Sequence, residues 1–287
     1  MTAKQPAEQH QLSQLAARLG ERDWSMLDTI RAFRYLTTRQ VARQHFGAEG
    51  ADCSIPRNAN AALDRLRELG LLVNLQRRIG GVRAGSGGHV WQITDTAQRL
   101  LAAKYDQPRG ARVRAFEPGT TFLEHTLAVA EVVISLQEAG TSAQLSQFAL
   151  EPDAWRSYLA YGGATKTLKP DLAATTSSGK YEDVWFFEID LDTEPPSRII
   201  TKSLQYQEYR TTGREQDALG IFPAVVWVVP NKRRNDQLRE RLAADTRIDN
   251  RLFIVITPDQ IGELLALGAE TFNKRTGGQK EEHPHEK

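Results

Sequence analysis

Three carboxylates lie where two strand-like runs of this sequence are expected to end. Asp171 follows Leu168-Lys169-Pro170, and Glu188 and Asp190 close the run that starts at Val184. Carboxylate oxygens are the ligands that Mg²⁺ prefers, and at neighbouring strand ends they can hold the ion against a phosphodiester. We therefore predict a metal site formed by Asp171, Glu188 and Asp190. Mg²⁺ is the expected cofactor if the chain is catalytic, and otherwise none is expected.

The hydrophobic periodicity after residue 120 predicts an α/β domain that would position these residues. Apolar spacing indicates a first helix over 121–138, and Lys202, Gln205 and Tyr209 fall on a later one near the carboxylates. The expected strands are 144–150, 168–174, 184–190, 224–229 and 252–256, and the further helices are 197–212, 232–243 and 258–267. The order α, β, β, β, α, β, α, β is that of the restriction-endonuclease-like sandwich.

The first part of the chain has the element order of a winged helix-turn-helix. Helices are expected over 23–33 with Asp23 as cap, from Thr37 or Thr38 onward, over 56–69, and after Thr94; strands are expected at 71–75 and 89–93. This order resembles the winged helix domains of bacterial regulators. In that resemblance the third helix would face the major groove and the hairpin would be the wing. The expected DNA-binding residues are Arg57, Asn58, Asn60, Arg65, Arg77, Arg78 and Arg83.

Charge and composition agree with a DNA-binding protein of two domains. Residues 1–115 hold 18 Lys and Arg against 10 Asp and Glu, whereas the remainder is acidic, and a basic surface attracts phosphate. The 287 residues have a hydrophobic fraction of 40% and a single Cys, and no apolar run could span a membrane. We expect a cytoplasmic protein of α/β class with the following parts: a polar segment 1–20, a winged helix domain 21–107, a linker 108–119, a nuclease-like domain 120–270 and a disordered tail 271–287.

The segment 121–256 resembles the PD-(D/E)xK nuclease superfamily. Asp171 after Pro170 and Glu188 match its two metal-binding carboxylates, but Asp190 stands where the family has lysine. The resemblance implies that Lys202, on the following helix, could supply this charge and polarise the attacking water, so Asp171, Glu188 and Lys202 are the candidate catalytic residues. Gln205 and Tyr209 match the pattern of the RecB-like branch. Unpaired carboxylates at 188 and 190 would repel each other unless a cation or Lys202 lay close.

The whole chain, over about 24–256, resembles the replication-relaxation family of plasmids and integrative elements. The resemblance includes the run Leu123-Glu124-His125-Thr126-Leu127 and the pattern Lys-x-x-Gln-Tyr-x-x-Tyr from Lys202. It implies DNA handling during plasmid replication or conjugative mobilisation, with double-stranded DNA and relaxase or replication proteins as partners.

Three functions follow from this reading. The first is a DNA-binding accessory protein whose nuclease-like domain does not cut, and the lost lysine at position 190 favours it. The second is an active Mg²⁺-dependent endonuclease or nickase. The third is a transcriptional regulator of the element that encodes it. Because winged helix regulators often pair, we expect a homodimer with no membrane association.

Overall fold

The computed structural model describes residues 4–47, 56–75, 89–108, 118–140 and 143–277. Contacts divide the chain into a first unit, Met1–Ile134, and a second unit, Ser135–Lys287. The chain contains both helices and sheets, and the α/β class expected from the sequence is confirmed.

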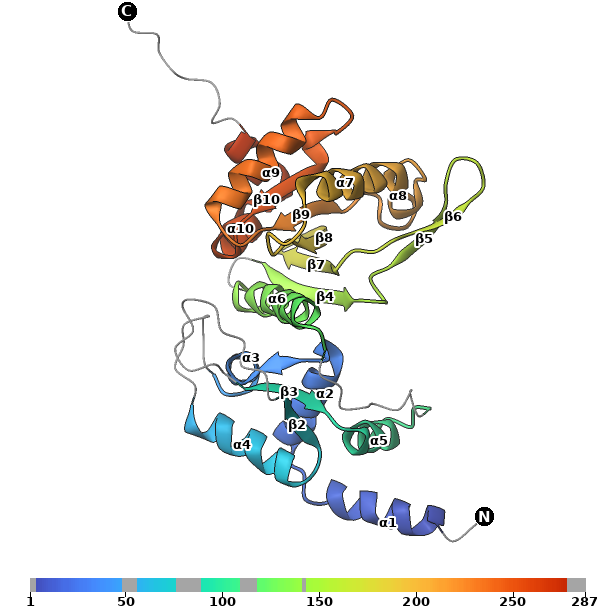
Figure 1. Cartoon of the computed structure of the whole chain (residues 1–287), viewed down its shortest axis with the longest axis vertical. Coiled ribbons are helices and arrows are strands. Elements are labelled where there is room, and N and C mark those ends of the chain that lie inside the picture. Colours follow the sequence, from blue (N-terminus) through green and yellow to red (C-terminus); the bar gives the residue numbers. More distant parts are fainter. Residues whose placement is uncertain (1–3, 48–55, 76–88, 109–117, 141–142, 278–287) are drawn as a thin grey trace, which may run out of the picture. The chain divides into compact units, whose positions relative to one another are not determined.

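The first unit consists of helices around a three-stranded antiparallel sheet of order β1-β3-β2 (Figure 1). Its elements in chain order are α1 (Lys4–Ala16), α2 (Glu21–Phe33), β1 (Leu36–Thr37), α3 (Thr38–His45), α4 (Arg57–Glu68), β2 (Leu72–Leu75), β3 (Val90–Ile93), α5 (Asp95–Lys104) and the first part of α6 (Thr120–Glu138). Two of them are additional to the expected pattern: the helix α1, in the segment taken only as polar, and the two-residue strand β1.

Local hydrogen bonds explain where these helices begin. The Thr37 hydroxyl accepts the N–H of Gln40 at 3.2 Å, and the Gln40 side chain accepts the N–H of Thr37 at 3.0 Å, which together form a capping box. Thr94 caps α5 as expected. Asp23 is not the cap of α2, because the helix starts two residues earlier and the Asp23 carboxylate reaches back to accept the N–H of Gly20 at 2.8 Å.

Buried apolar side chains hold α4 and the sheet within the first unit. The expected stripe on α4 is buried at Ala59, Leu63 and Leu66. An apolar cluster joins the sheet to α6, and its members are Tyr35, Leu75, Val90, Leu123 and Leu127. Residues 120–134, which we expected to open the second domain, therefore pack in the first unit.

The second unit is built on a five-stranded mixed sheet of order β10-β9-β8-β7-β4. In chain order its elements are β4 (Gln144–Leu150), β5 (Arg156–Leu159), β6 (Thr165–Leu168), β7 (Leu172–Ser178), β8 (Tyr181–Ile189), α7 (Pro196–Arg210), α8 (Arg214–Leu219), β9 (Ala224–Val228), α9 (Lys232–Ala244), η1 (Asn250–Leu252), β10 (Phe253–Ile256), η2 (Pro258–Gln260) and α10 (Ile261–Gly277). β8, β9 and β10 are parallel, whereas β4, β7 and β8 are antiparallel.

Three expectations for this unit are corrected. The strand expected over 168–174 is interrupted, because Leu168 ends β6 and β7 begins only at Leu172. The hairpin of β5 and β6 and the short helix α8 were not expected. Residues 271–277, expected in a disordered tail, continue α10, and Phe272 is fully buried.

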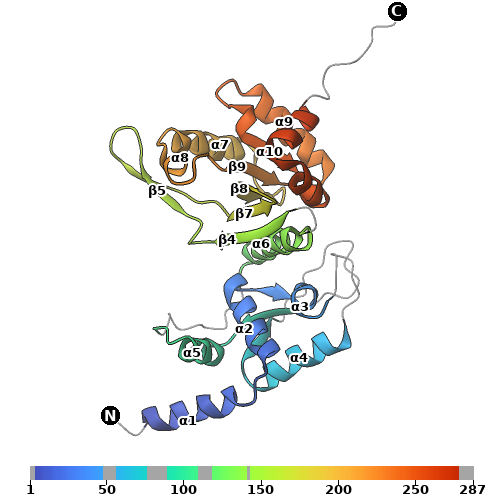
Figure 2. The same ribbon diagram turned by 180° about the vertical axis from the view of Figure 1, so that it is seen from behind.

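Helices α7 and α9 lie on the same face of this sheet (Figures 1 and 2). Phe186 of β8 packs with Tyr206 of α7 and Leu238 of α9 in one buried cluster. Since side chains alternate along a strand, Glu188 and Asp190 point to this face as well. The sheet therefore directs both carboxylates toward α7 and α9.

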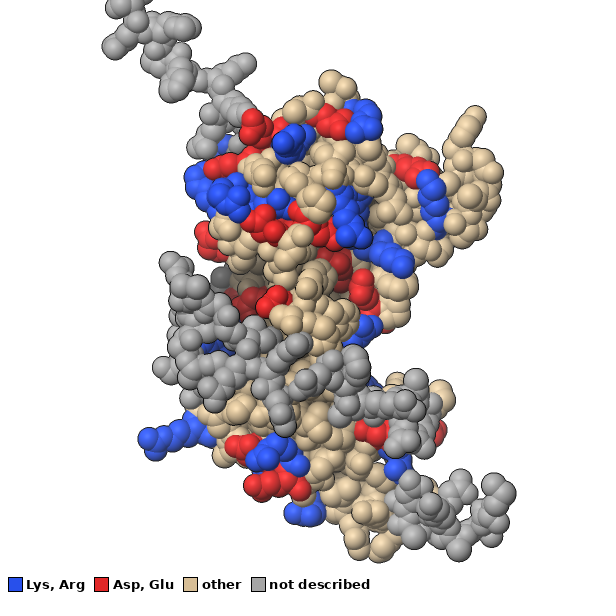
Figure 3. Space-filling model, in the orientation of Figure 1, with Lys and Arg blue, Asp and Glu red and all other residues tan. Residues whose placement is uncertain are grey.

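The surface of the second unit mixes charges of both signs. On the face shown in Figure 3, acidic and basic side chains of the described residues are interspersed rather than gathered by sign. Among the helices of the described ranges, none combines the length and the apolar character needed to cross a membrane.

Candidate functional site

Antiparallel pairing brings Asp171 and Glu188 together. Leu172 at the start of β7 pairs with Phe187 near the end of β8. Because the two strands are antiparallel, Asp171, which precedes Leu172, lies beside Glu188, which follows Phe187. Asp171 thus precedes a strand rather than ending one, which corrects the expected placement. Its Oδ2 accepts the backbone N–H of Ile189 at 2.8 Å, and this bond fixes the carboxylate against the end of β8.

Glu188 is buried between two side chains of α7. Only 1% of it is exposed. Lys202 Nζ donates to Oε2 in a short contact, and the Tyr206 hydroxyl donates to Oε1 at 2.5 Å. Lys202 and Tyr206 are four residues apart on one helix, so they lie on the same side of α7. The structure therefore places Lys202 at the carboxylates, as expected from the sequence, and adds Tyr206.

The other two residues singled out on α7 lie away from Glu188. Gln205 Nε2 donates to the carbonyl of Thr167 at 3.1 Å, and the Tyr209 hydroxyl donates to Glu215 at 2.6 Å. These contacts hold the helix against the β5–β6 hairpin and α8. The helical spacing of four from Lys202 was the signal that could have identified Tyr206.

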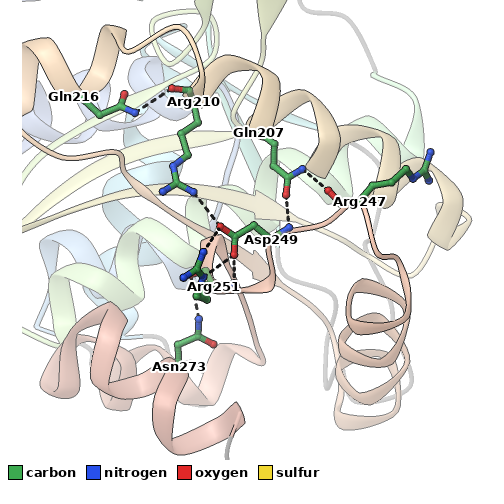
Figure 4. A network of polar contacts seen from close by, with 7 residues as sticks. All are labelled: Gln207, Arg210, Gln216, Arg247, Asp249, Arg251 and Asn273. Atoms are coloured by element: carbon green, nitrogen blue, oxygen red, sulfur yellow. Dashed lines mark hydrogen bonds and ion pairs between the residues drawn. The ribbon is translucent and has the colours of Figure 1, made fainter.

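A polar network fixes α7 from another side (Figure 4). Gln207 accepts the N–H of Asp249 at 2.5 Å and donates to the carbonyl of Arg247 at 2.8 Å. Arg210 contacts the Asp249 carboxylate at 3.3 Å. These bonds join α7 to the segment between α9 and β10, so the helix that carries Lys202 is anchored by several elements.

Asp190 is paired with a buried arginine. Arg234 of α9 donates from Nε to Asp190 Oδ2 at 2.6 Å and from Nη2 to Oδ1 at 3.3 Å. The N–H of Asp192 also donates to Oδ1 at 3.1 Å. The cation required beside position 190 is thus Arg234, which lies 44 residues further along the chain and was not anticipated.

Burial governs the charges around Glu188. Desolvation, together with the Asp171 carboxylate, raises the pKa of Glu188 to about 8, although Lys202 and the hydrogen bond from Tyr206 oppose the rise. Burial lowers the pKa of Lys202, but the carboxylates of Glu188 and Asp171 outweigh it, and the net shift is upward. Burial also raises the pKa of Tyr206 well above its usual value. Lys202 therefore stays charged at neutral pH, and the charged form of Glu188 is disfavoured.

The donor set does not fit a divalent cation as the side chains are arranged. Both oxygens of Glu188 accept hydrogen bonds from α7, and both oxygens of Asp190 are bonded to Arg234. Within the described residues, no group of three or more His, Cys, Asp or Glu side chains is arranged to hold a metal. A Mg²⁺ ion would have to displace Lys202 from Glu188, and Asp190 could join it only by leaving Arg234.

The expected DNA-binding residues of α4 lie on its outer side. Arg57, Asn58 and Asn60 are exposed. Arg65 is exposed as well but forms an ion pair with Asp23 of α2. The three expected wing residues Arg77, Arg78 and Arg83 lie outside the described residues.

Helix α3, which precedes α4, is bonded to α6. Gln40 Nε2 donates to the carbonyl of Leu127 at 2.9 Å and to Glu131 Oε2 at 3.1 Å. Arg43, whose side chain is almost completely buried, forms a short ion pair with Glu131. Glu131 therefore serves the packing of the first unit.

Comparison with known families gives one match. The family model described as replication-relaxation matches residues 27–225, which is more than half of the chain and includes α4, Asp171, Glu188 and Lys202. Comparisons with curated proteins and with solved structures give no match.

Proposed function

The chain belongs to the replication-relaxation family, and we propose on this basis that it is a DNA-binding accessory protein in the replication or mobilisation of a mobile element. In this proposal the first unit is a winged helix-turn-helix that docks on double-stranded DNA. The second unit is a nuclease-like domain that does not cut, and the protein works as a homodimer with relaxase or replication proteins.

The observation that carries the proposal is the outer side of α4. Ala59, Leu63 and Leu66 are buried, while Arg57 and Asn60 are exposed at the start of the helix. Arginine and asparagine can form paired hydrogen bonds with guanine and adenine in the major groove, and arginine also neutralises phosphate. A helix with this division between its faces suits the recognition position of a helix-turn-helix.

Charge reversal at Arg57 tests DNA binding. Arg57→Glu should weaken binding of a fluorescent duplex about tenfold or more at moderate salt, because it removes an attraction to phosphate and adds a repulsion. Fluorescence anisotropy measures the dissociation constant directly, and circular dichroism checks that the variant is folded.

The matched control is Arg251→Glu in the second unit. The Arg251 side chain is 90% exposed, so this variant makes the same change of charge at the surface and gives up only an exposed ion pair with Asp249. It should bind the duplex within about twofold of the unaltered protein. Equal affinity in Arg57→Glu and in the unaltered protein would remove α4 as the DNA-contacting helix.

An endonuclease is the second candidate, because Asp171, Glu188 and Lys202 meet at one point. A supercoiled plasmid incubated with the protein and Mg²⁺ or Mn²⁺ distinguishes the two functions. The accessory role predicts no nicking above that of an Asp171→Ala preparation. Metal-dependent nicking that Asp171→Ala abolishes, with duplex affinity retained, would establish the endonuclease instead.

A further inference from the structure

Arg234 is the most deeply buried cation next to the site. Its side chain and that of Asp190 are each 3% exposed. The two parallel contacts between guanidinium and carboxylate have the fork geometry that makes arginine a strong and directional partner. A buried carboxylate in this position uses its hydrogen-bonding capacity on protein groups rather than on an external cation.

The same guanidinium also binds the segment that connects β8 to α7. Arg234 Nη2 donates to the carbonyl of Glu194 at 2.7 Å, and Nη1 lies 3.1 Å from Asp192 Oδ1. Asp192 has a φ of 61°, in the left-handed region that residues other than glycine adopt infrequently, although Asp does so more often than most. Arg234 therefore holds a conformation that the backbone alone would disfavour, directly before the helix that brings Lys202 to Glu188.

Two helices thus supply one cation each to the carboxylates at the end of β8, and Arg234 is the buried one. Lys202 of α7 binds Glu188, and Arg234 of α9 binds Asp190. Separating a buried charge from its partner is strongly unfavourable, because it leaves an uncompensated charge away from water. A divalent ion would have to offset such a cost at Asp190 before it gained a ligand there.

We propose that Arg234 is an internal counter-ion that occupies Asp190 in place of a divalent cation and closes this carboxylate site to metal. This inference rests on the proposed function, because it explains how the nuclease-like unit is kept in a form that does not cut. It assigns Arg234 a positioning role toward Asp190 and the segment that follows, with no contact to a substrate.

Mn²⁺ titration by calorimetry, on the full chain, tests the inference. Arg234→Gln removes the charge and retains a hydrogen-bonding side chain, so the folded variant should bind Mn²⁺ at least tenfold more tightly than the unaltered protein. Adding Asp190→Asn to Arg234→Gln should abolish the gain. The neighbouring Arg233→Gln is the matched control. The Arg233 side chain is 71% exposed and pairs with Oδ2 of Asp192, so this variant should give no gain.

Two results would overturn the inference: equally tight Mn²⁺ binding in the unaltered protein and in folded Arg234→Gln, or a gain that survives Asp190→Asn. If Arg234→Gln does not fold, Arg234→Lys replaces it. A single ammonium cannot reproduce the two parallel contacts of the guanidinium, so Arg234→Lys should give a smaller gain in Mn²⁺ affinity. No gain in folded Arg234→Lys would also count against the inference. Duplex affinity measured on the same preparations tests the proposed function separately. If the unaltered protein does not bind the duplex, the proposed function is contradicted whatever the Mn²⁺ result.

Discussion

Glu188 combines deep burial with two hydrogen-bond donors from one helix. Burial penalises its charged form, whereas Lys202 and Tyr206 favour that form. Burial has the larger effect, so the pKa of Glu188 is raised. The unfolded chain exposes the carboxyl to water, where its pKa returns to the usual 4.5. The native state therefore holds a proton over a pH range in which the unfolded state has released it.

This difference predicts a pH dependence of stability that Glu188→Gln removes. A raised native pKa contributes stability that is complete below pH 4.5 and is lost as the pH rises through about 8. The free energy of unfolding of the unaltered protein should fall by about 2 kcal/mol relative to Glu188→Gln across this range, less than the limit for an isolated group because Glu188 is coupled to the charged Lys202. Urea denaturation at several pH values measures both curves; parallel curves would contradict a raised pKa at Glu188.

At the residue scale, sequence reasoning identified the carboxylates and Lys202 but not Tyr206 or Arg234. Asp171 and Glu188 could be predicted as site residues because the ends of strands and the residues of a motif are local features of the sequence. The role of Arg234 could not, since its contact with Asp190 joins residues 44 positions apart and depends on how α9 packs on the sheet. The repulsion expected between Glu188 and Asp190 did indicate that some cation had to be present.

At the element scale, α6 and α3 are joined by an ion pair between buried Arg43 and half-buried Glu131 that should stabilise the first unit. Glu131→Ala should lower the free energy of unfolding by about 2 kcal/mol, because Arg43 stays buried after losing its carboxylate partner. Thermal or urea denaturation followed by circular dichroism measures the change. Glu124→Ala on the same helix is the control and should change stability by less than about 0.5 kcal/mol. Equal effects of the two variants would show that the ion pair is not stabilising.

Elements with strong local signals were predictable and those that depend on tertiary pairing were not. The caps at Thr37 and Thr94 and the apolar strand β9 follow from short-range chemistry. The β5–β6 hairpin has polar, exposed strands with weak apolar alternation, so its sequence resembles a loop. Pro170 lacks an N–H for a sheet ladder, which accounts for the break between β6 and β7 and for the later start of the second strand.

At the scale of the whole molecule, charge is divided between the two ends of the chain. Residues 1–115 carry the basic excess, with 18 Lys and Arg against 10 Asp and Glu. The second unit mixes both signs on the face shown in Figure 3. Electrostatic attraction to DNA should therefore arise mainly from the first unit, and the carboxylate site of the second should contribute little to it.

The salt dependence of duplex binding tests this division of roles. Each phosphate contact adds about one to the slope of log affinity against log salt, because binding releases counterions. Arg57→Glu should reduce the slope by about one, whereas Asp171→Ala combined with Glu188→Ala should leave both slope and affinity within error, because neither carboxylate contributes to phosphate neutralisation. Anisotropy titrations at four or more salt concentrations give the slopes. A slope that changes in the double variant while that of Arg57→Glu is unaltered would place the phosphate contacts on the second unit and reverse the assignment of the two roles.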